Sequence, residues 1–316
     1  TNPDWADPTS LGAGTHWLGE LLGTGRLQKY NVSYSGGNDK TNYYVSMGYY
    51  SEKGTAKANS GVDRFTFRTN LDTQEVDWLK FGANVALTYS KYQTIVTGWY
   101  TQSPILQAVT ALPYKSPYEI IYNPDGTISW GDPYEVYPWD NMIDLNQYYE
   151  KNTNNRQSMD LMGQTYFLLT PVKGLTIRAQ QAVDAYDYTN TSINYPSYEP
   201  YSARGRNGKA FQRYYQLSST NTAEYKTDIN KKHFFAVLAG HESFIRHQSD
   251  FSATGTGLTD DRIVNFGSTT DISSWAGNDM ECAFNSFFGN ANYNYADRYF
   301  VDASIRTDGS SLFGKN

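Results

Sequence analysis

Apolar and polar residues alternate with a period of two along most of the chain. Residues 78–90 show the pattern clearly, with Leu79, Phe81 and Val85 at one set of positions and Lys80 and Asn84 at the other. Successive side chains of a strand point to opposite faces, so this alternation predicts sheets with one apolar and one polar face. Runs of this kind predict ten strands, at residues 28–36, 42–50, 63–71, 78–90, 158–170, 175–186, 212–226, 232–242, 280–295 and 299–307.

The segments between these runs alternate in length. The short ones lie at 36–40, 72–77, 171–174, 228–232 and 296–298, and the long ones at 51–62, 91–157, 187–211 and 243–279. In an up-and-down barrel, strict alternation places all short turns at one rim and all long loops at the other, which is the pattern of outer-membrane barrels. A β-sandwich or a propeller does not require it.

The length of the runs points the same way. Many of them reach the ~9–11 residues that a tilted strand needs to cross a bilayer. The sequence therefore predicts an all-β fold, a transmembrane antiparallel β-barrel, with short periplasmic turns and long extracellular loops.

The overall composition is compatible with such a barrel. The mean hydropathy is only −0.63, but alternation hides a membrane-spanning strand from any hydropathy window. Aromatic residues make up 16% of the chain, including 28 tyrosines, which suits the aromatic girdles of a membrane barrel. The polar residues expected to face a wet lumen are Arg64, Arg68, Lys80, Asn84, Asp160, Gln164, Arg178 and Asp184. Those expected to anchor strand ends at the membrane interface are Trp17, Trp78, Tyr89, Tyr293, Tyr295 and Tyr299.

Charge and cysteine content exclude several classes of partner and site. A net charge of −6 and a pI near 5.3 argue against nucleic acid, which requires clustered lysine and arginine. The single cysteine, Cys282, excludes an intrachain disulfide and any cysteine-rich metal site.

Neither metal binding nor catalysis is favoured by the titratable residues. His241, Glu242 and His247 lack the spacing of a zinc-binding HExxH motif and are expected at a strand end. The carboxylates of Asp260-Asp261 and of Asp271 and Asp279 are expected in a loop, and no spacing singles out a catalytic or calcium-binding pair. Residues 254–260 are expected to form a flexible loop. We therefore expect no cofactor, no metal ion and no enzyme.

The long segment 91–157 is rich in aromatic and turn residues, and loops of this length are usually functional or disordered. Two alternatives are open: the rings stack on a sugar or grip a peptide, or they only pack the loop against its neighbours. The candidate ligand-binding residues are Trp99, Tyr100, Trp130, Tyr134, Tyr137 and Trp139.

Two stretches carry a resemblance to a known family. The stretch "FFGNANYNYADRYFVDASIRTDGSSLFGKN", residues 287–316, resembles a conserved-looking motif of the SusC/RagA-type TonB-dependent outer-membrane transporters through its FG, NY, R and DGSS elements. Residues 16–57, which contain "TGRLQKYNVSYSGG" and "TNYYVSMGYYSEKG", are similar to the family's segment entering the barrel, and "VLAGHES" at 237–243 resembles a third stretch.

The resemblance implies a location and a function. Members of the family lie in the outer membrane of Gram-negative bacteria of the Bacteroidetes type. They import oligosaccharides or oligopeptides beneath a SusD-like surface lipoprotein, with energy from TonB acting through a plug domain. The alternative is a soluble all-β protein that binds or cleaves glycans. A full-length protein that is soluble in plain buffer would favour the glycan-binding or glycan-cleaving alternative. A protein that is soluble only in detergent would favour a barrel in contact with outer-membrane lipid.

The resemblance also implies a division of the chain. Residues 1–27 are expected to form a segment leading into the barrel, and residues 28–316 a partial TonB-dependent receptor β-barrel. About ten strands are present against the roughly 22 of a plugged transporter, so the plug domain and the remaining strands are expected to be absent from this chain.

Overall fold

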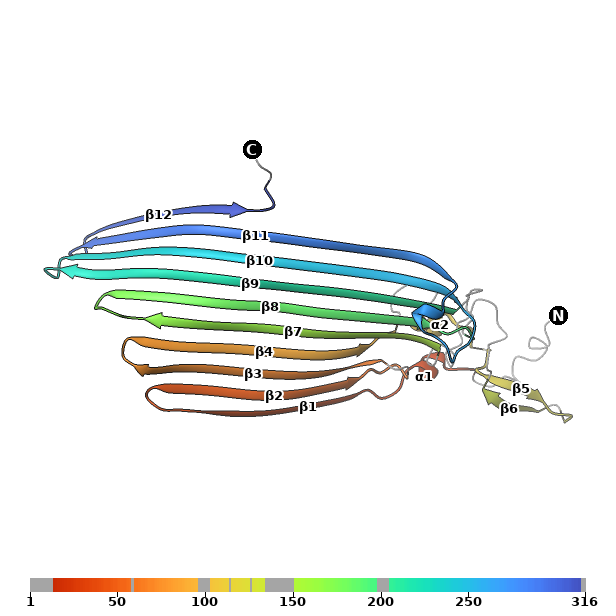
Figure 1. The fold of residues 1–316 in the computed structure, drawn as a ribbon. Helices are drawn as coiled ribbons and strands as arrows, with labels where there is room; N and C mark the ends of the chain where they lie inside the picture. The colour runs from red at the N-terminus through yellow and green to blue at the C-terminus, as the bar shows by residue number, and fades with distance from the viewer. Residues whose placement is uncertain are drawn as a thin grey trace.

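The computed structural model describes residues 14–57, 60–95, 103–113, 115–125, 127–133, 151–197 and 205–313. Its main feature is a single ten-stranded antiparallel sheet (Figure 1). The strands are β1 (Arg26–Gly37), β2 (Thr41–Lys53), β3 (Gly61–Val76), β4 (Leu79–Gln93), β7 (Asn152–Leu169), β8 (Leu175–Asn194), β9 (Gly205–Ile229), β10 (His233–Leu258), β11 (Asp271–Tyr295) and β12 (Tyr299–Ser310). All ten predicted strands are confirmed.

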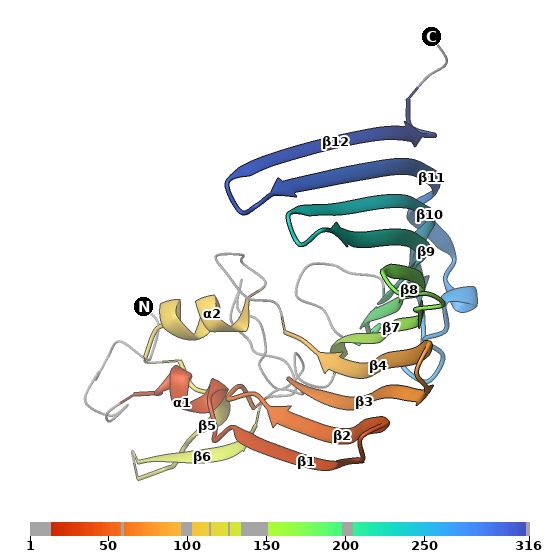
Figure 2. The same cartoon turned by 90° about the vertical axis from the view of Figure 1, so that its left-hand side faces the viewer.

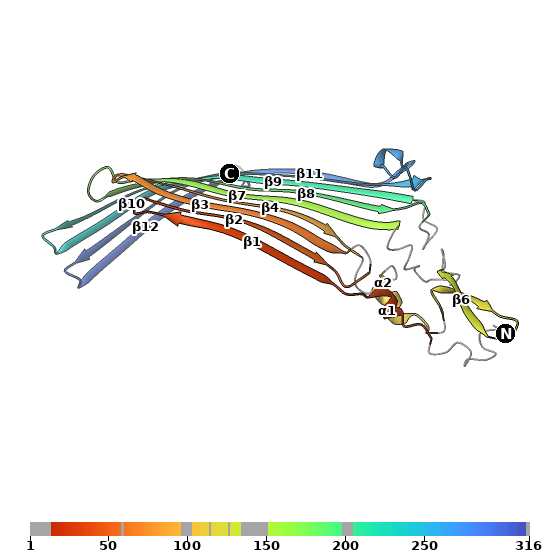
Figure 3. The same ribbon diagram turned by 90° about the horizontal axis from the view of Figure 1, so that it is seen from below.

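Each strand of this sheet pairs with the next one along the chain, in the order β1-β2-β3-β4-β7-β8-β9-β10-β11-β12. The sheet is curved, and Figures 2 and 3 show it as an open trough rather than a flat layer. Short turns lie at one end of the strands and long connections at the other, as predicted. The sheet is therefore part of a barrel wall, with β1 and β12 at its open edges.

Two of the short turns have the geometry that tight antiparallel hairpins favour. Asn230 and Lys231, between β9 and β10, have φ values of 56° and 54°, and Ala296 and Asp297, between β11 and β12, have 53° and 55°. Two successive left-handed residues form a type I′ turn, whose twist matches that of the strands it joins. These turns hold the register of the β9–β10 and β11–β12 hairpins.

Several predicted strand boundaries were too short, and the predicted loops were correspondingly too long. Residues 187–194 and 205–211 belong to β8 and β9, and most of 243–279 belongs to β10 and β11. His241, Glu242 and His247 therefore lie within β10 and not at a strand end, Asp271 and Asp279 lie in β11 and not in a loop, and residues 254–258 are strand. In these extensions apolar residues such as Ile245, Phe251 and Trp275 are separated by several polar ones, so no continuous apolar face marked them as strand.

The register defines the two faces of the sheet. Residues that pair directly across neighbouring strands lie on the same face of a sheet. Arg68 pairs with Ala86, Ala86 with Met162, and Met162 with Asp184, so these four side chains share one face. All eight polar residues predicted to face the lumen lie on this one face. Its side chains are the more crowded, as expected on a concave surface, with Ser90, Ser158 and Cys282 buried.

The opposite, outward face carries a band of large apolar side chains. Tyr30, Tyr49, Phe65, Tyr89 and Met159 are successive partners across five strands, and we call this row the upper girdle. The rings of Tyr49 and Phe65 lie 4.7 Å apart, and those of Tyr30 and Tyr49 6.4 Å.

Below the upper girdle, towards the short turns, the apolar side chains are still more exposed. Val32 is 73% exposed and Met47 62%. A soluble protein does not present so large an apolar face to water, so this face contacts lipid.

Over β8–β11 the apolar band is interrupted by polar side chains. These are Gln181, Ser219, Ser243 and Asn285, paired in one row, and Asn221 and His241, paired in the next. The Gln181 and Asn221 amides donate to Ser219 Oγ (2.8 and 3.0 Å), and His241 Nε2 lies 2.6 Å from Asn285 Oδ1. These mutual hydrogen bonds lower the cost of placing polar groups near hydrocarbon.

The connection between β4 and β7 contains structure that the alternation pattern did not predict. It holds the helix α2 (Pro104–Thr110) and a separate hairpin of β5 (Tyr118–Tyr122) and β6 (Ile128–Pro133). The short helix α1 (Trp17–Leu21) precedes β1 and packs against α2 on the open side of the trough (Figure 2). No helix in the described ranges is long and apolar enough to cross a membrane.

Trp17 is not an interface anchor as predicted. It is 3% exposed, its indole Nε1 donates to the Leu112 carbonyl (3.2 Å), and Leu21 beside it is fully buried. The indole thus packs α1 onto the loop that follows α2. Trp78, at the turn between β3 and β4, is 51% exposed and free to act as an anchor.

The two faces predict opposite responses to a charge placed in the middle of β4. Val85→Arg puts a guanidinium on the outward face and should cost about 2–4 kcal/mol of folding free energy in a bilayer. Asn84→Arg, one residue earlier, faces the polar concave side and should leave the folded fraction unchanged. Heat-modified electrophoretic mobility of each whole transporter variant in outer-membrane fractions measures this fraction. Equal losses in both variants would contradict the assignment of the faces.

Candidate functional site

The concave face near the long connections carries a cluster of arginine and aromatic side chains. Arg156, in β7, lies between two rings, with its guanidinium carbon 4.6 Å from the Tyr188 centroid and 5.6 Å from that of Tyr92. Its Nη2 also donates to the Tyr186 hydroxyl (3.3 Å). β4, β7 and β8 are neighbours in the sheet, so one arginine links three strands.

The neighbouring arginine, Arg64 of β3, extends this cluster. Its Nη2 donates to the Tyr92 hydroxyl (3.4 Å), and its guanidinium lies 5.7 Å from the Tyr50 ring centroid. Tyr92 thus contacts two arginines, on one side through its hydroxyl and on the other through its ring face.

A second arginine-aromatic cluster lies across β9 and β10. The Arg246 Nε and Nη2 atoms both donate to Gln216 Oε1 (3.0 and 2.8 Å), and the guanidinium lies 5.4 Å from the Phe244 ring and 5.8 Å from the Tyr214 ring. The Tyr214 hydroxyl donates to the same oxygen (3.2 Å). The amide of Gln216 fixes the arginine in place without neutralising its charge.

These two clusters form what we call the arginine wall, made of Arg64, Tyr92, Arg156, Tyr186, Tyr188, Tyr214, Gln216 and Arg246. Arginine stacked on aromatic rings keeps some N–H groups available while its orientation is fixed. Below the wall, a hollow of about 390 Å³ is lined by Arg68, Asn84, Gln164, Asp184 and Gln216 among others. A surface of this kind binds solutes that carry carboxylates, amides or hydroxyl groups.

The predicted lumen residues account for only part of this wall. Arg64 was named from the sequence, but Arg156, Tyr188 and Arg246 lie outside the predicted strand limits. The signal that would have found them is the continued period-two spacing of Tyr186 and Tyr188 beyond residue 186.

The six candidate residues of segment 91–157 are placed only in part. Trp130 lies in β6, where it pairs with Ile120. Trp99, Tyr100, Tyr134, Tyr137 and Trp139 lie outside the described residues. Their contact with a ligand stays a prediction.

The DGSS motif near the end of the chain contributes to an ion-pair network, not to a catalytic or metal site. Arg306 of β12 donates to Asp308 (2.8 Å) and to Glu242 of β10 (3.0 Å), and the Ser286 hydroxyl of β11 donates to Asp308. The network joins three adjacent strands on the concave face. Glu242 therefore has a structural partner.

A second ion-pair network joins three of the long segments between strands to one another. The Asp261 carboxylate, between β10 and β11, accepts from Lys151 Nζ (2.7 Å), at the start of β7, and from the Ser197 amide (3.0 Å) and hydroxyl (2.5 Å), after β8. Burial alone would raise the pKa of Asp261, but the hydrogen bonds from Lys151 and Ser197 outweigh it and hold this pKa below 3.8. We call this contact the loop clamp.

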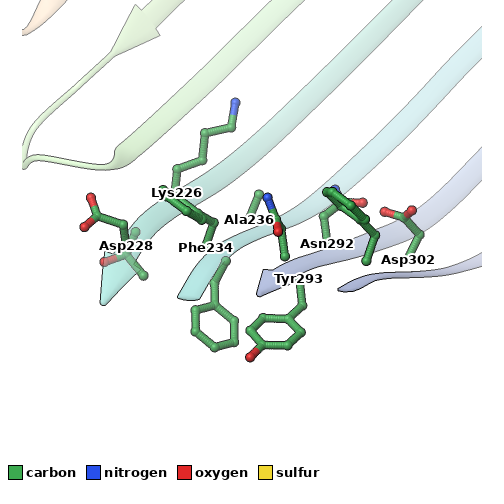
Figure 4. Close-up of a pocket in the computed structure, with 11 residues that line it drawn as sticks. Lys226, Asp228, Phe234, Ala236, Asn292, Tyr293 and Asp302 are labelled. Carbon is green, nitrogen blue, oxygen red and sulfur yellow. The ribbon is translucent and has the colours of Figure 1, made fainter. Parts of the chain in front are cut away.

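A further hollow lies at the opposite end of the strands, beside the short turns of β9–β12. Its volume is about 350 Å³, and its lining includes Lys226, Phe234, Phe300 and Asp302. Figure 4 shows that Lys226 and Tyr293 point to opposite sides of the strands. This hollow combines aromatic rings with charged groups at the periplasmic rim.

Comparison with known proteins gives consistent relatives, although no protein-family model matches the chain. The chain is 29% identical to TonB-dependent receptor P26 of Formosa agariphila and 26% identical to TonB-dependent receptor SusC of Bacteroides thetaiotaomicron. These matches cover 94% and 100% of this chain. Among solved structures, the RagAB peptide importer matches 96% of the chain at 27% identity, with TM-scores of 0.75 in its closed-closed state and 0.77 in its open-open state.

A curved antiparallel sheet with a lipid-facing apolar band, a polar concave face and long connections at one rim defines part of an outer-membrane β-barrel. In sequence and fold the chain is similar to a stretch of a SusC/RagA-type TonB-dependent transporter, as the sequence motifs predicted. It is located in the bacterial outer membrane. The chain spans 29% and 32% of the length of the two named receptors and 34% of the RagAB chain.

The loop clamp yields a prediction for loop mobility and its pH dependence. Asp261→Asn should speed amide exchange of Tyr195 and Ser197 about tenfold or more at neutral pH, because a hydrogen bond to a charged group contributes about 1.5–3 kcal/mol. The folded-state pKa is lowered, so the clamp is complete above pH 3.8 and is lost as the pH falls through that lower pKa. Hydrogen exchange with mass spectrometry measures the rates.

The neighbouring residue supplies the control. Asp260 pairs with Arg262, whose side chain is 87% exposed, so Asp260→Asn should leave the exchange of Tyr195 and Ser197 unchanged. Equal acceleration by both variants, or by neither, would show that Asp261 does not hold the loops together.

Proposed function

We propose that the chain forms part of the wall of a transporter that imports an oligosaccharide or an oligopeptide across the outer membrane. The observation that carries this proposal is the arginine wall, because it places fixed guanidinium groups and aromatic faces on the concave side of the sheet. Aromatic rings stack on sugar faces, and guanidinium groups bind carboxylates and carbonyls. The peptide importer among the similar structures supports the peptide class in particular.

We also propose the partners of the whole transporter. A SusD-like surface lipoprotein would cover the extracellular rim, where the loop clamp ties the connections near Lys151, Ser197 and Asp261 into a fixed base. TonB would supply energy through a plug domain encoded by other parts of the whole protein. The aromatic and charged hollow at the periplasmic rim offers that plug a contact.

We propose that the chain carries no enzymatic activity. The named relatives are receptors and an importer. Two of the acidic residues considered as a catalytic pair have other partners: Asp260 binds Arg262, and Asp261 binds Lys151. Import therefore depends on binding and release and needs no chemical step from these residues.

The arginine wall predicts a defect in uptake. Arg156→Ala in the whole transporter removes one guanidinium and its contacts to Tyr186 and Tyr188. Loss of one charged hydrogen bond from this guanidinium to the solute should weaken solute binding about tenfold or more. Uptake of labelled oligopeptides and of labelled oligosaccharides by cells expressing each variant measures the effect and separates the two substrate classes.

The control is a second arginine that faces outward. Arg213 in β9 pairs with Asp187 (2.7 Å) on the lipid-facing side, so Arg213→Ala should leave uptake unchanged. If Arg156→Ala cells took up both solute classes at the normal rate, with the variant present at normal levels in the outer membrane, the arginine wall would not be the binding surface.

A further inference from the structure

A polar hollow of about 1040 Å³ lies at the extracellular ends of β1–β4 and β7. Its position follows from the register. Two outward-facing rows lie beyond the upper girdle, on the side of the long connections. The first row, two residues from the girdle, is Gln28, Ser51, Asp63, Lys91 and Gln157. The second row, two residues further, is Arg26, Lys53, Gly61, Gln93 and Asn155. All ten of these residues line the hollow, so it opens on the outward face of the barrel wall.

Cations outnumber acids in this hollow. Arg26, Lys53, Lys57 and Lys91 line it, against Asp63 and Glu52. Asp63 accepts a hydrogen bond from the Tyr49 hydroxyl (2.9 Å), and Glu52 accepts one from Tyr50. Arg156 also contributes to the lining, but its guanidinium is held by the rings of the arginine wall.

Among the described residues, these four cations have no carboxylate within ion-pair distance, whereas several others on the barrel do. Arg213, Lys226 and Arg306 each form an ion pair within 3.0 Å of a carboxylate. By contrast, within the described ranges Arg26, Lys53, Lys57 and Lys91 form no such pair. Like charges gathered in one hollow repel one another, so an anion that binds there is stabilised by all of them.

The height of the hollow in the membrane identifies the kind of anion. Lys91 Nζ lies 5.8 Å from the Tyr89 ring centroid, and Tyr89 belongs to the upper girdle, where the apolar band ends. The hollow therefore sits in the headgroup layer of the outer leaflet. Lipid headgroups at that height carry phosphates, and basic residues near a membrane surface bind them.

We propose that this hollow binds the phosphorylated sugar headgroup of a glycolipid of the outer leaflet. Arg26, Lys53 and Lys91 contact the phosphate oxygens, for which guanidinium and ammonium groups are suited. The amide side chains of Gln93 and Asn155 hydrogen-bond the sugar hydroxyls. This site lies on the outside of the wall and does not depend on which solute the barrel imports.

The test uses the purified whole transporter in detergent and native mass spectrometry. Lipopolysaccharide is added at matched concentrations to wild type and to the double variant Lys53→Gln/Lys91→Gln. The bound fraction should fall at least threefold in the double variant. Lipopolysaccharide stripped of its phosphates should bind wild type as weakly as intact lipopolysaccharide binds the double variant.

Two further variants separate a specific site from general charge or misfolding. Lys173→Gln/Lys232→Gln makes the same charge change at the periplasmic turns and should retain full binding. Lys53→Arg/Lys91→Arg keeps the charge and should also bind normally, which confirms that the position tolerates substitution. Equal binding by wild type and Lys53→Gln/Lys91→Gln would overturn the proposal, as would displacement of the lipid by an equal concentration of inorganic phosphate.

Discussion

Every backbone amide and carbonyl that crosses a membrane must find its hydrogen-bond partner within the protein, because hydrocarbon offers none. The structure satisfies this constraint in the simplest way, since each strand pairs with its neighbour along the chain from β1 to β12. Only the outer edges of β1 and β12 remain open. Such edges do not persist in lipid, which is why a sheet of this kind belongs to a closed barrel. Relatives about three times as long as this chain are consistent with that requirement.

Once the hydrogen bonds between the strands are fixed, successive side chains of each strand face opposite sides of the sheet. The same strand therefore contributes to the lipid-facing surface and to the concave surface. In β7, Met159 belongs to the upper girdle, while Asp160 beside it faces the lumen. In β4, Tyr89 and Lys91 face outward and Tyr92 contacts the arginines inside. The arginine wall therefore lies on the concave face, and the hollow at the extracellular ends of β1–β4 and β7 lies mainly on the outward face. At the rim, Tyr92 and Arg156 border both. A one-residue slip in register would exchange the two environments, so the tight type I′ turns have a functional consequence.

The sequence predicted the strands and the orientation of their faces because lipid on one side imposes a strict apolar period. It could not predict where the strands end. Above the membrane both faces are wet, so beyond Tyr188 residues 189–194 and 205–211 alternate with little hydrophobic contrast. The two helices and the β5–β6 hairpin were missed for another reason. Trp17 and Leu21 are buried by α2 and by residues near Leu112, which lie some ninety residues further along the chain, and no local pattern encodes such a contact.

The extension of the strands beyond the membrane explains where the arginine wall lies. Arg156 stands three residues beyond Met159 of the upper girdle, on the side of the long connections. A guanidinium at that height remains hydrated, so it does not incur the cost of a charge buried in the bilayer. The strand pairing nonetheless holds it as firmly as a residue inside the membrane, since β7 continues to pair with both β4 and β8 there. The paired strands thus hold the hydrated part of the sheet beyond the membrane as rigidly as the part inside it. The arginine wall therefore stands at the extracellular end of the concave face, beyond the height of the upper girdle.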